Sequence, residues 1–205
     1  MLTYDEKQIV ARIARLEPRR RSAFAAACAE ALLPLYARYL RVQKSQIEAL
    51  SLADVVDTVW LSIESGARGA DLHRVQADVE SLVPSDPEDS WVWESGLAQS
   101  AVAAVAYAVG SLLDSEPRVI GWASRQVHEV ADYVAVKMLG GDSTEFPLER
   151  DIAQSLVVQY ALESLERWLS ALEAPGGEIN AVRENARAAG VWLDSVLDRL
   201  RVSGW

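Results

Sequence analysis

Histidine and cysteine are scarce in this chain, which limits the metal and nucleophile chemistry it can carry. Only Cys28, His73 and His128 occur in 205 residues. A single cysteine cannot form an intramolecular disulfide, which is typical of a reducing compartment, so we expect a cytoplasmic protein. Cys28 lies among alanines with no neighbouring cation to activate its thiol. We therefore expect a small core side chain there and not a nucleophile.

Sequence motifs of the common enzyme classes are missing as well. The chain has no glycine-rich phosphate loop, no G-x-G-x-x-G after a strand and no G-x-S-x-G elbow. Di-iron bundle enzymes need Glu-x-x-His repeats. In this chain the residues three positions before His73 and His128 are Ala70 and Arg125, so neither histidine belongs to such a repeat. The charged N-terminus has no apolar segment typical of a secretory signal. The sequence therefore predicts no catalytic residue and no cofactor.

Acidic residues outnumber basic ones, and the excess is unevenly distributed. The formal net charge is −10, with +5 in residues 1–44 and −15 in residues 45–205. An acidic body repels phosphate, so we expect no nucleic-acid binding. The basic run at residues 19–21 is interpreted as a solvated helix start and not as a phosphate site.

Apolar residues recur every three or four positions throughout the chain, and no segment alternates like a strand. Leu52, Val56, Val59 and Ile63 illustrate the spacing, which puts one apolar face on a helix. The pattern predicts a single all-α domain over residues 1–205, a bundle of about seven or eight helices. The expected helices lie near 5–16, 18–41, 45–64, 69–82, 91–113, 117–139, 147–173 and 178–202.

Residues 95–113 carry no charge and could match the thickness of a bilayer. Their apolar residues are mostly alanine and valine, however, and serine, glutamine and glycine are interspersed among them. Leucine, isoleucine and phenylalanine favour membrane insertion more strongly. We therefore expect an alanine-rich central helix of a soluble bundle and no membrane interaction.

Two tryptophans precede this central helix, next to an acidic turn at residues 84–90. Trp91 and Trp93 are two positions apart, so on a helix they point to different sides and would pack against different neighbours. The alternative is an aromatic ligand-binding mouth that includes both tryptophans.

The best candidate for a metal site is His128 with Asp132, four residues apart on one helical face, with Glu129 between them. This spacing imitates two metal ligands of a zinc-protease helix. A third ligand is missing nearby, because His73 lies on a different predicted helix. An ordinary i,i+4 pair is the preferred interpretation.

Two short motifs resemble a known family. Pro34 and Tyr36 form a Pro-x-Tyr motif in "LLPLYARYL", and Asp57 and Trp60 form an Asp-x-x-Trp motif in "DVVDTVWLSI". With the order of the following segments, the chain resembles the YjaG-like bacterial proteins (DUF416), a family of unknown function. The resemblance implies a compact all-α bacterial cytoplasmic protein and no established catalytic residue.

These four motif residues are expected to be structural, and a ligand pocket around Tyr36, Asp57 and Trp60 is the alternative. Asp57 and Trp60 lie at the edge of an apolar helix face, where their polar groups need partners. Arg38 or Arg125 is the expected charge partner of Asp57.

Two functions follow as hypotheses. The first is a non-enzymatic interaction protein, a regulator or an immunity-type protein, whose acidic surface binds a basic protein partner or a second copy of itself. The second is a small-ligand or metal-binding bundle around His128 and Asp132, with Asp57 or His73 nearby.

Overall fold

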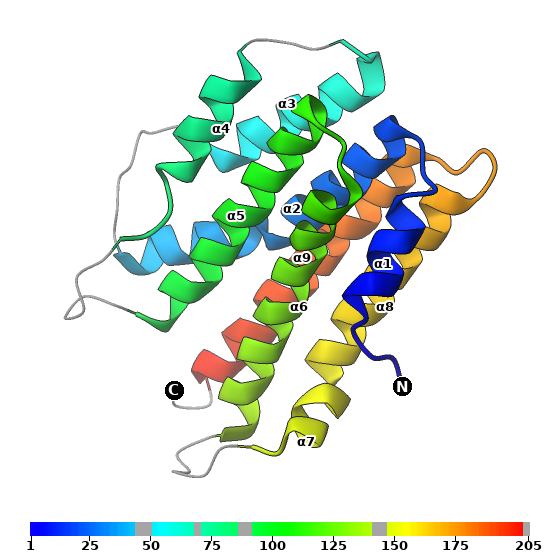
Figure 1. Cartoon of the computed structure of the whole chain (residues 1–205). Coiled ribbons are helices and arrows are strands. Elements are labelled where there is room, and N and C mark those ends of the chain that lie inside the picture. Colours follow the sequence, from blue (N-terminus) through cyan, green and yellow to red (C-terminus); the bar gives the residue numbers. More distant parts are fainter. Residues whose placement is uncertain (44–50, 68–70, 86–91, 141–146, 203–205) are drawn as a thin grey trace.

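The computed structural model describes the backbone of residues 1–43, 51–67, 71–85, 92–140 and 147–202, and side chains as far as residue 200. Within these ranges the chain forms nine helices and no strand (Figure 1). The predicted all-α class is therefore confirmed. The helices are α1 (Glu6–Ile13), α2 (Pro18–Gln43), α3 (Leu52–Ser65), α4 (Leu72–Glu80), α5 (Trp93–Leu113), α6 (Pro117–Gly140), α7 (Glu149–Gln154), α8 (Leu156–Glu173) and α9 (Ile179–Val202).

Two helices, and not one, occupy the centre of the bundle. The expected central helix α5 packs against α2, α3, α4 and α6, and α2 packs against α3, α5, α6, α8 and α9. Residues 22–32 of α2 are all buried, which requires neighbours on every side of that helix. The Ser22 hydroxyl donates to the carbonyl of Ser111 at 3.0 Å, which joins the start of α2 to the end of α5. The two central helices are thus antiparallel, and their small side chains allow close packing.

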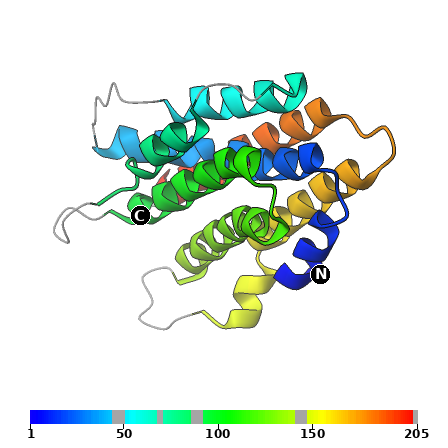
Figure 2. The ribbon, with the colours of Figure 1, turned by 45° about the horizontal axis from the view of Figure 1, so that its top comes forward.

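Apart from the short α7, the remaining helices form two groups around this pair. Helices α3 and α4 lie on one outer side, over α2 and α5, whereas α1, α6, α8 and α9 enclose the other sides (Figures 1 and 2). Pro34 lies within α2, and the helix continues past it to Gln43.

Two predicted helix boundaries were wrong. The helix expected over 147–173 is divided into α7 and α8, because Ser155 adopts an extended conformation with ψ 148° and caps α8 by accepting from the Val158 amide. The helix expected from residue 45 begins at Leu52, because Ser51 is extended and caps it through the Asp54 amide. Residues 45–50 lie outside the described part of the chain.

Helix α5 is also the one described helix whose length and composition would suit a membrane span. In its most apolar window, 56% is buried inside the bundle. A core helix meets the same two criteria of length and composition, so these do not separate the two interpretations.

Candidate functional site

A buried carboxylate, that of Glu30, connects three helices. Glu30 is 5% exposed in the alanine-rich part of α2. Its Oε2 accepts from the indole Nε1 of Trp60 in α3 at 3.0 Å. Its Oε1 accepts from Nε of Arg187 in α9 at 2.9 Å. An isolated buried carboxylate would be costly, so these partners are needed for the charge to remain inside.

Arg183, one helical turn before Arg187, completes the cluster. Its Nε lies 3.5 Å from Oε2 of Glu30, and its guanidinium carbon lies 5.6 Å from the centre of the Trp60 ring. A second guanidinium nitrogen, Nη2, donates to Oδ1 of Asp57. We call these five residues (Glu30, Asp57, Trp60, Arg183 and Arg187) the Glu30 cluster.

The expected partners of Asp57 were therefore wrong. Arg38 instead pairs with Asp194 and Asp198 of α9, and Arg125 pairs with Glu6 of α1. The error arose because α9 packs alongside α2 and brings Arg183 within reach of α3, a tertiary arrangement that helical periodicity does not determine.

The Glu30 cluster contains both residues of the Asp-x-x-Trp motif, and each is used for contact between helices. Both oxygens of the Glu30 carboxylate are occupied by donors or cations from Trp60, Arg183 and Arg187. Its geometry therefore suits a polar connection between α2, α3 and α9 better than proton transfer. The sequence interpretation missed Glu30, although an acid inside an alanine-rich run was a visible signal.

The His128–Asp132 pair forms as expected for residues four apart, with 3.7 Å between Nε2 and Oδ1. The His128 ring stacks on Tyr4 at a centroid distance of 4.4 Å, which fixes the imidazole against α1's N-terminal extension. Within the described ranges, no three His, Cys, Asp or Glu side chains converge as metal ligands would. His73 is exposed on α4 and not beside this pair.

The aromatic candidates are separated from one another. Tyr36 is buried in α2, where burial raises the pKa of its hydroxyl, and its ring lies 6.2 Å from that of Tyr39. Trp93 is half-buried at the start of α5, with its ring 6.3 Å from that of Tyr133. Trp91 lies outside the described residues. Tyr36 lies in α2 and Trp60 in α3, and the ligand pocket around the motif residues stays a prediction.

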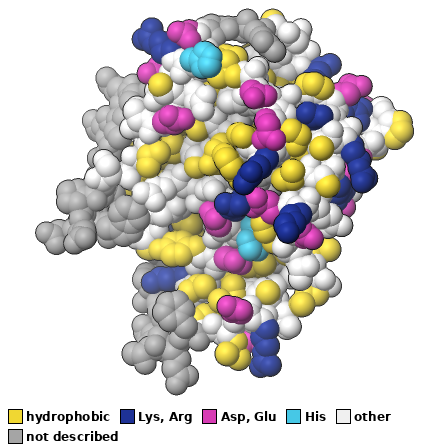
Figure 3. Space-filling model, in the orientation of Figure 1, with side chains coloured by type: hydrophobic (Ala, Val, Ile, Leu, Met, Phe, Trp, Pro, Cys, Tyr) yellow, Lys and Arg dark blue, Asp and Glu magenta, His cyan; other side chains and the backbone are white. Residues whose placement is uncertain are grey.

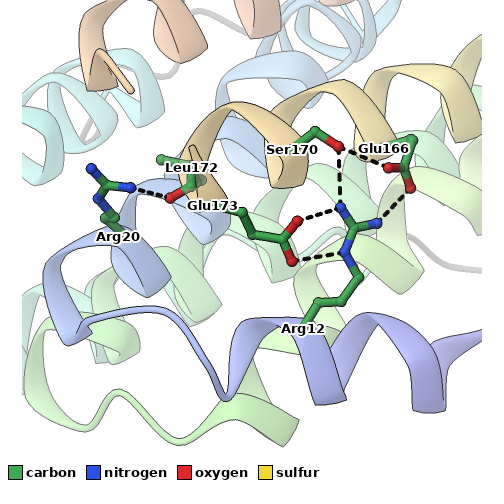
Figure 4. A network of polar contacts seen from close by, with 6 residues as sticks. All are labelled: Arg12, Arg20, Glu166, Ser170, Leu172 and Glu173. Carbon is green, nitrogen blue, oxygen red and sulfur yellow. Dashed lines mark hydrogen bonds and ion pairs between the residues drawn. The ribbon is translucent and has the colours of Figure 1, made fainter. Parts of the chain in front are cut away.

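A second polar network joins α1 to α8 (Figure 4). Arg12 donates through Nε and Nη2 to both carboxylate oxygens of Glu173, at 2.9 and 2.8 Å, and through Nη1 to Glu166 at 2.5 Å. Ser170 bridges the network by donating to Glu166 at 2.8 Å. The Arg12 guanidinium lowers the pKa of both glutamates, chiefly through these hydrogen bonds. The network attaches the short helix α1 to the bundle.

The basic run after Pro18 has a structural use that the sequence interpretation missed. Arg19 donates to the carbonyl of Glu64, near the end of α3. Arg20 donates to the carbonyl of Leu172, near the end of α8 (Figure 4), and also to the carbonyl of Ala174. Arg21 donates to the carbonyl of Leu16 at 2.8 Å. Cations at helix C-termini satisfy unpaired carbonyls and oppose the negative end of the helix dipole.

The sequence around α3 and α4 is rich in acidic residues. Residues 51–94, which include α3 and α4, contain ten acidic and two basic residues, a net charge of −8. We define the α3–α4 face by its exposed acids Asp54, Glu64, Asp71, Asp78 and Glu80. By contrast, acidic and basic side chains are interspersed over α1 and α6 in Figure 3. Among the described residues, α3, α4 and the cap residue Asp71 together carry six acids and one basic residue, Arg74.

Comparisons with known proteins identify the family and the fold. The family model of DUF416, described as a protein of unknown function, matches residues 8–191. A crystal structure of a DUF416 family protein from Shewanella baltica OS155 superimposes with a TM-score of 0.72 and 17% identity, covering 88% of this chain and 94% of that one. No curated protein matches the chain. Since the family match spans most of the sequence, this chain belongs to the DUF416 family.

Proposed function

We propose that this protein is a cytoplasmic, non-enzymatic binding protein whose α3–α4 face docks a basic surface of a protein partner. The observation that carries the proposal is that α3, α4 and the cap residue Asp71 carry six acids and, among their described residues, one basic residue, Arg74. Complementary charge accelerates encounter and selects partners, and its effect is largest where charges of one sign are grouped.

The position of the α3–α4 face supports docking. Both helices form an outer layer (Figure 2), and their acids project from residues that the core does not use. Of the described residues in α3 and α4, Arg74 alone is a Lys or Arg. Nucleic acid would be repelled by this face, whereas an Arg- or Lys-rich protein surface would be attracted.

The metal alternative has less support. His128 and Asp132 contact each other and Tyr4, and the remaining expected ligands, Asp57 and His73, lie elsewhere. Elemental analysis of the purified protein tests this alternative directly. A stoichiometric metal ion that is lost in His128→Ala would favour it over docking.

The docking proposal is tested by reversing charge on the α3–α4 face in the triple variant Glu64→Lys, Asp78→Lys, Glu80→Lys. Partners are first captured from a cell extract at low salt, identified and purified. The dissociation constant of the purified pair is then measured. We expect it to rise at least about tenfold in the triple variant, and to rise with salt concentration in the unmodified protein.

The matched control reverses three acids elsewhere, in Glu163→Lys, Glu178→Lys, Glu184→Lys. These residues are exposed on or next to α8 and α9 and change the net charge equally. Less than about a threefold change in the dissociation constant is expected. Equal losses in both triple variants, or no captured protein that binds after purification, would contradict docking by the α3–α4 face. A second copy of this chain as the captured protein would identify self-association.

A further inference from the structure

A small cavity lies in the core where α2, α6, α8 and α9 meet. Its volume is about 20 Å³, and its walls are mostly apolar, with Leu32, Val127 and Leu193 among them. Among the described residues, no Asp, Glu, Lys, Arg or His lines it. A charged ligand would be buried there without a counter-charge, so the cavity is suited to a neutral molecule.

Two polar side chains of α8 belong to the wall of this cavity. Ser164 and Trp168, four residues apart on one side of the helix, both line it, and each is 1% exposed. Neither the hydroxyl oxygen of Ser164 nor the indole nitrogen of Trp168 forms a hydrogen bond with any described residue. Leaving such a buried group unpaired costs its full desolvation free energy.

Comparable side chains elsewhere in the core have partners. The buried hydroxyl of Ser111 donates to the carbonyl of Ala108 at 2.7 Å. The buried indole of Trp60 donates to the carboxylate of Glu30 at 3.0 Å. The two polar groups of α8 differ from these, because the described part of the chain supplies no partner for either of them. Buried polar groups in native proteins are paired with protein or with ordered water, so a molecule from solvent is the expected partner.

Two stacked aromatic rings separate the cavity from bulk solvent. Tyr160 and Trp192 also line it, and the centroids of their rings are 3.8 Å apart. Both residues are half-buried, whereas Ser164 and Trp168 are fully buried, so the stacked pair lies on the solvent side of the cavity. A molecule held behind these rings would exchange slowly with bulk water.

We propose that this cavity holds one internal water molecule, which bridges Ser164 and Trp168. The water accepts from the indole N–H of Trp168 and forms a second hydrogen bond with the hydroxyl of Ser164, which can donate or accept. A water needs a cavity of about 10–15 Å³ and two to four polar partners, so a volume of about 20 Å³ with two partners is sufficient for one molecule. Pockets for drug-sized ligands span about 300–1,000 Å³, which excludes such a ligand here.

A high-resolution crystal structure should show one water oxygen within about 3.2 Å of both polar atoms. In solution, oxygen-17 relaxation dispersion counts long-lived internal waters. The count should fall by one in Ser164→Ala, by one in Trp168→Phe and again by one in the double variant, because the same molecule is lost each time. An empty cavity, a water bound to one of the two groups alone, an unchanged count in either single variant, or a loss of two waters in the double variant would overturn the proposal.

The melting temperature separates a bridged Ser164 hydroxyl from an unpaired one. Ser164→Ala should melt about 2–4 °C below the control Ser195→Ala, because it removes the bridge and leaves the indole N–H of Trp168 unpaired. Ser195 is exposed on α9, so its replacement reports the gain in helix propensity without the loss of a buried contact. A Ser164→Ala variant at least as stable as this control would show that the hydroxyl had no partner and would also overturn the proposal. The triple charge reversal on the α3–α4 face should keep the water count, so this site and protein docking are tested separately.

Discussion

Single polar residues inside this protein are stabilised by partners from distant parts of the sequence. Glu30 is separated from Trp60 by 30 positions and from Arg187 by 157. Each partner offsets part of the cost of burying the carboxylate, so removing one should cost more than an ordinary surface contact.

Trp60→Phe tests the indole contribution to the Glu30 cluster. The variant keeps an aromatic ring but loses the donor to Glu30, and hydrogen bonds to charged groups are worth about 1.5–3 kcal/mol. We expect the free energy of unfolding in urea to fall by about 2 kcal/mol. Trp122→Phe is the control, because Trp122 packs against Tyr107 and no described hydrogen bond uses its indole nitrogen. A smaller loss is expected there, and equal losses would show that the Glu30 contact contributes little.

Arg12→Met tests the network between α1 and α8. The folded protein holds the pKa of Glu166 and Glu173 below the ordinary 4.5, so the stabilisation is complete above pH 4.5 and is lost as the pH falls through the lowered values. Because the glutamate side chains are 50% and 34% exposed, solvent screening limits the effect to about 1 kcal/mol near pH 7.

The measurement is urea unfolding of both proteins between pH 7 and the acid limit of folding. The difference between them should shrink below pH 4.5. Arg15→Met removes the same charge from an exposed neighbouring position and should change stability less. A difference that stays constant with pH would show that lost packing, and not the ion pairs, accounts for the effect of Arg12→Met.

At the scale of helices, the backbones of α9 and α2 approach each other closely at Gly190. A Cβ atom added to Gly190 would lie 2.7 Å from the carbonyl oxygen of Ala31, closer than such atoms pack. This contact lets the guanidinium groups of Arg183 and Arg187 in the same helix reach Glu30. Glycine at 190 therefore sets the distance on which the Glu30 cluster depends.

Gly190→Ala should force α9 away from α2 and lower the free energy of unfolding by about 1–3 kcal/mol, the usual cost of overpacking. Gly96→Ala is the matched control in α5, because its added Cβ would meet Tyr133 at an ordinary 3.7 Å. There the better helix propensity of alanine should leave stability unchanged or raise it by up to about 1 kcal/mol. Thermal unfolding of the two variants measures the contrast, and a neutral Gly190→Ala would show that the two helices can separate at no cost.

For the whole molecule, the acids of α3 and α4 form a group of like charges in which Arg74 is the one basic residue among the described residues of these two helices. Like charges grouped on one side destabilise the folded state, and salt screens this repulsion over about 10 Å at 0.1 M. Salt also weakens the scattered ion pairs of α1, α6 and α8. For these pairs, therefore, higher salt lowers the stability of the folded state.

We expect the melting temperature to rise by a few degrees when NaCl is increased from about 10 mM to about 150 mM, because the grouped repulsion outweighs the scattered pairs. The α3–α4 triple reversal should lose most of this rise, whereas the control at Glu163, Glu178 and Glu184 should keep more of it. Differential scanning calorimetry at both salt concentrations measures the effect. Equal responses of the two triple variants would show that total charge, and not its grouping, governs stability.

The sequence by itself determined the all-α class, most helix positions, the buried thiol of Cys28 and the His128–Asp132 pair. These follow from local spacing, because residues three or four apart on a helix share a face whatever the rest of the chain does. Packing alone determined that α2 shares the centre of the bundle with α5. It also determined that Asp57 pairs with Arg183 and not with Arg38 or Arg125. The convergence of Trp60 and Arg187 on Glu30 likewise depends on packing. Contacts between helices far apart in the chain depend on which faces meet and how closely, and no local pattern contains that information.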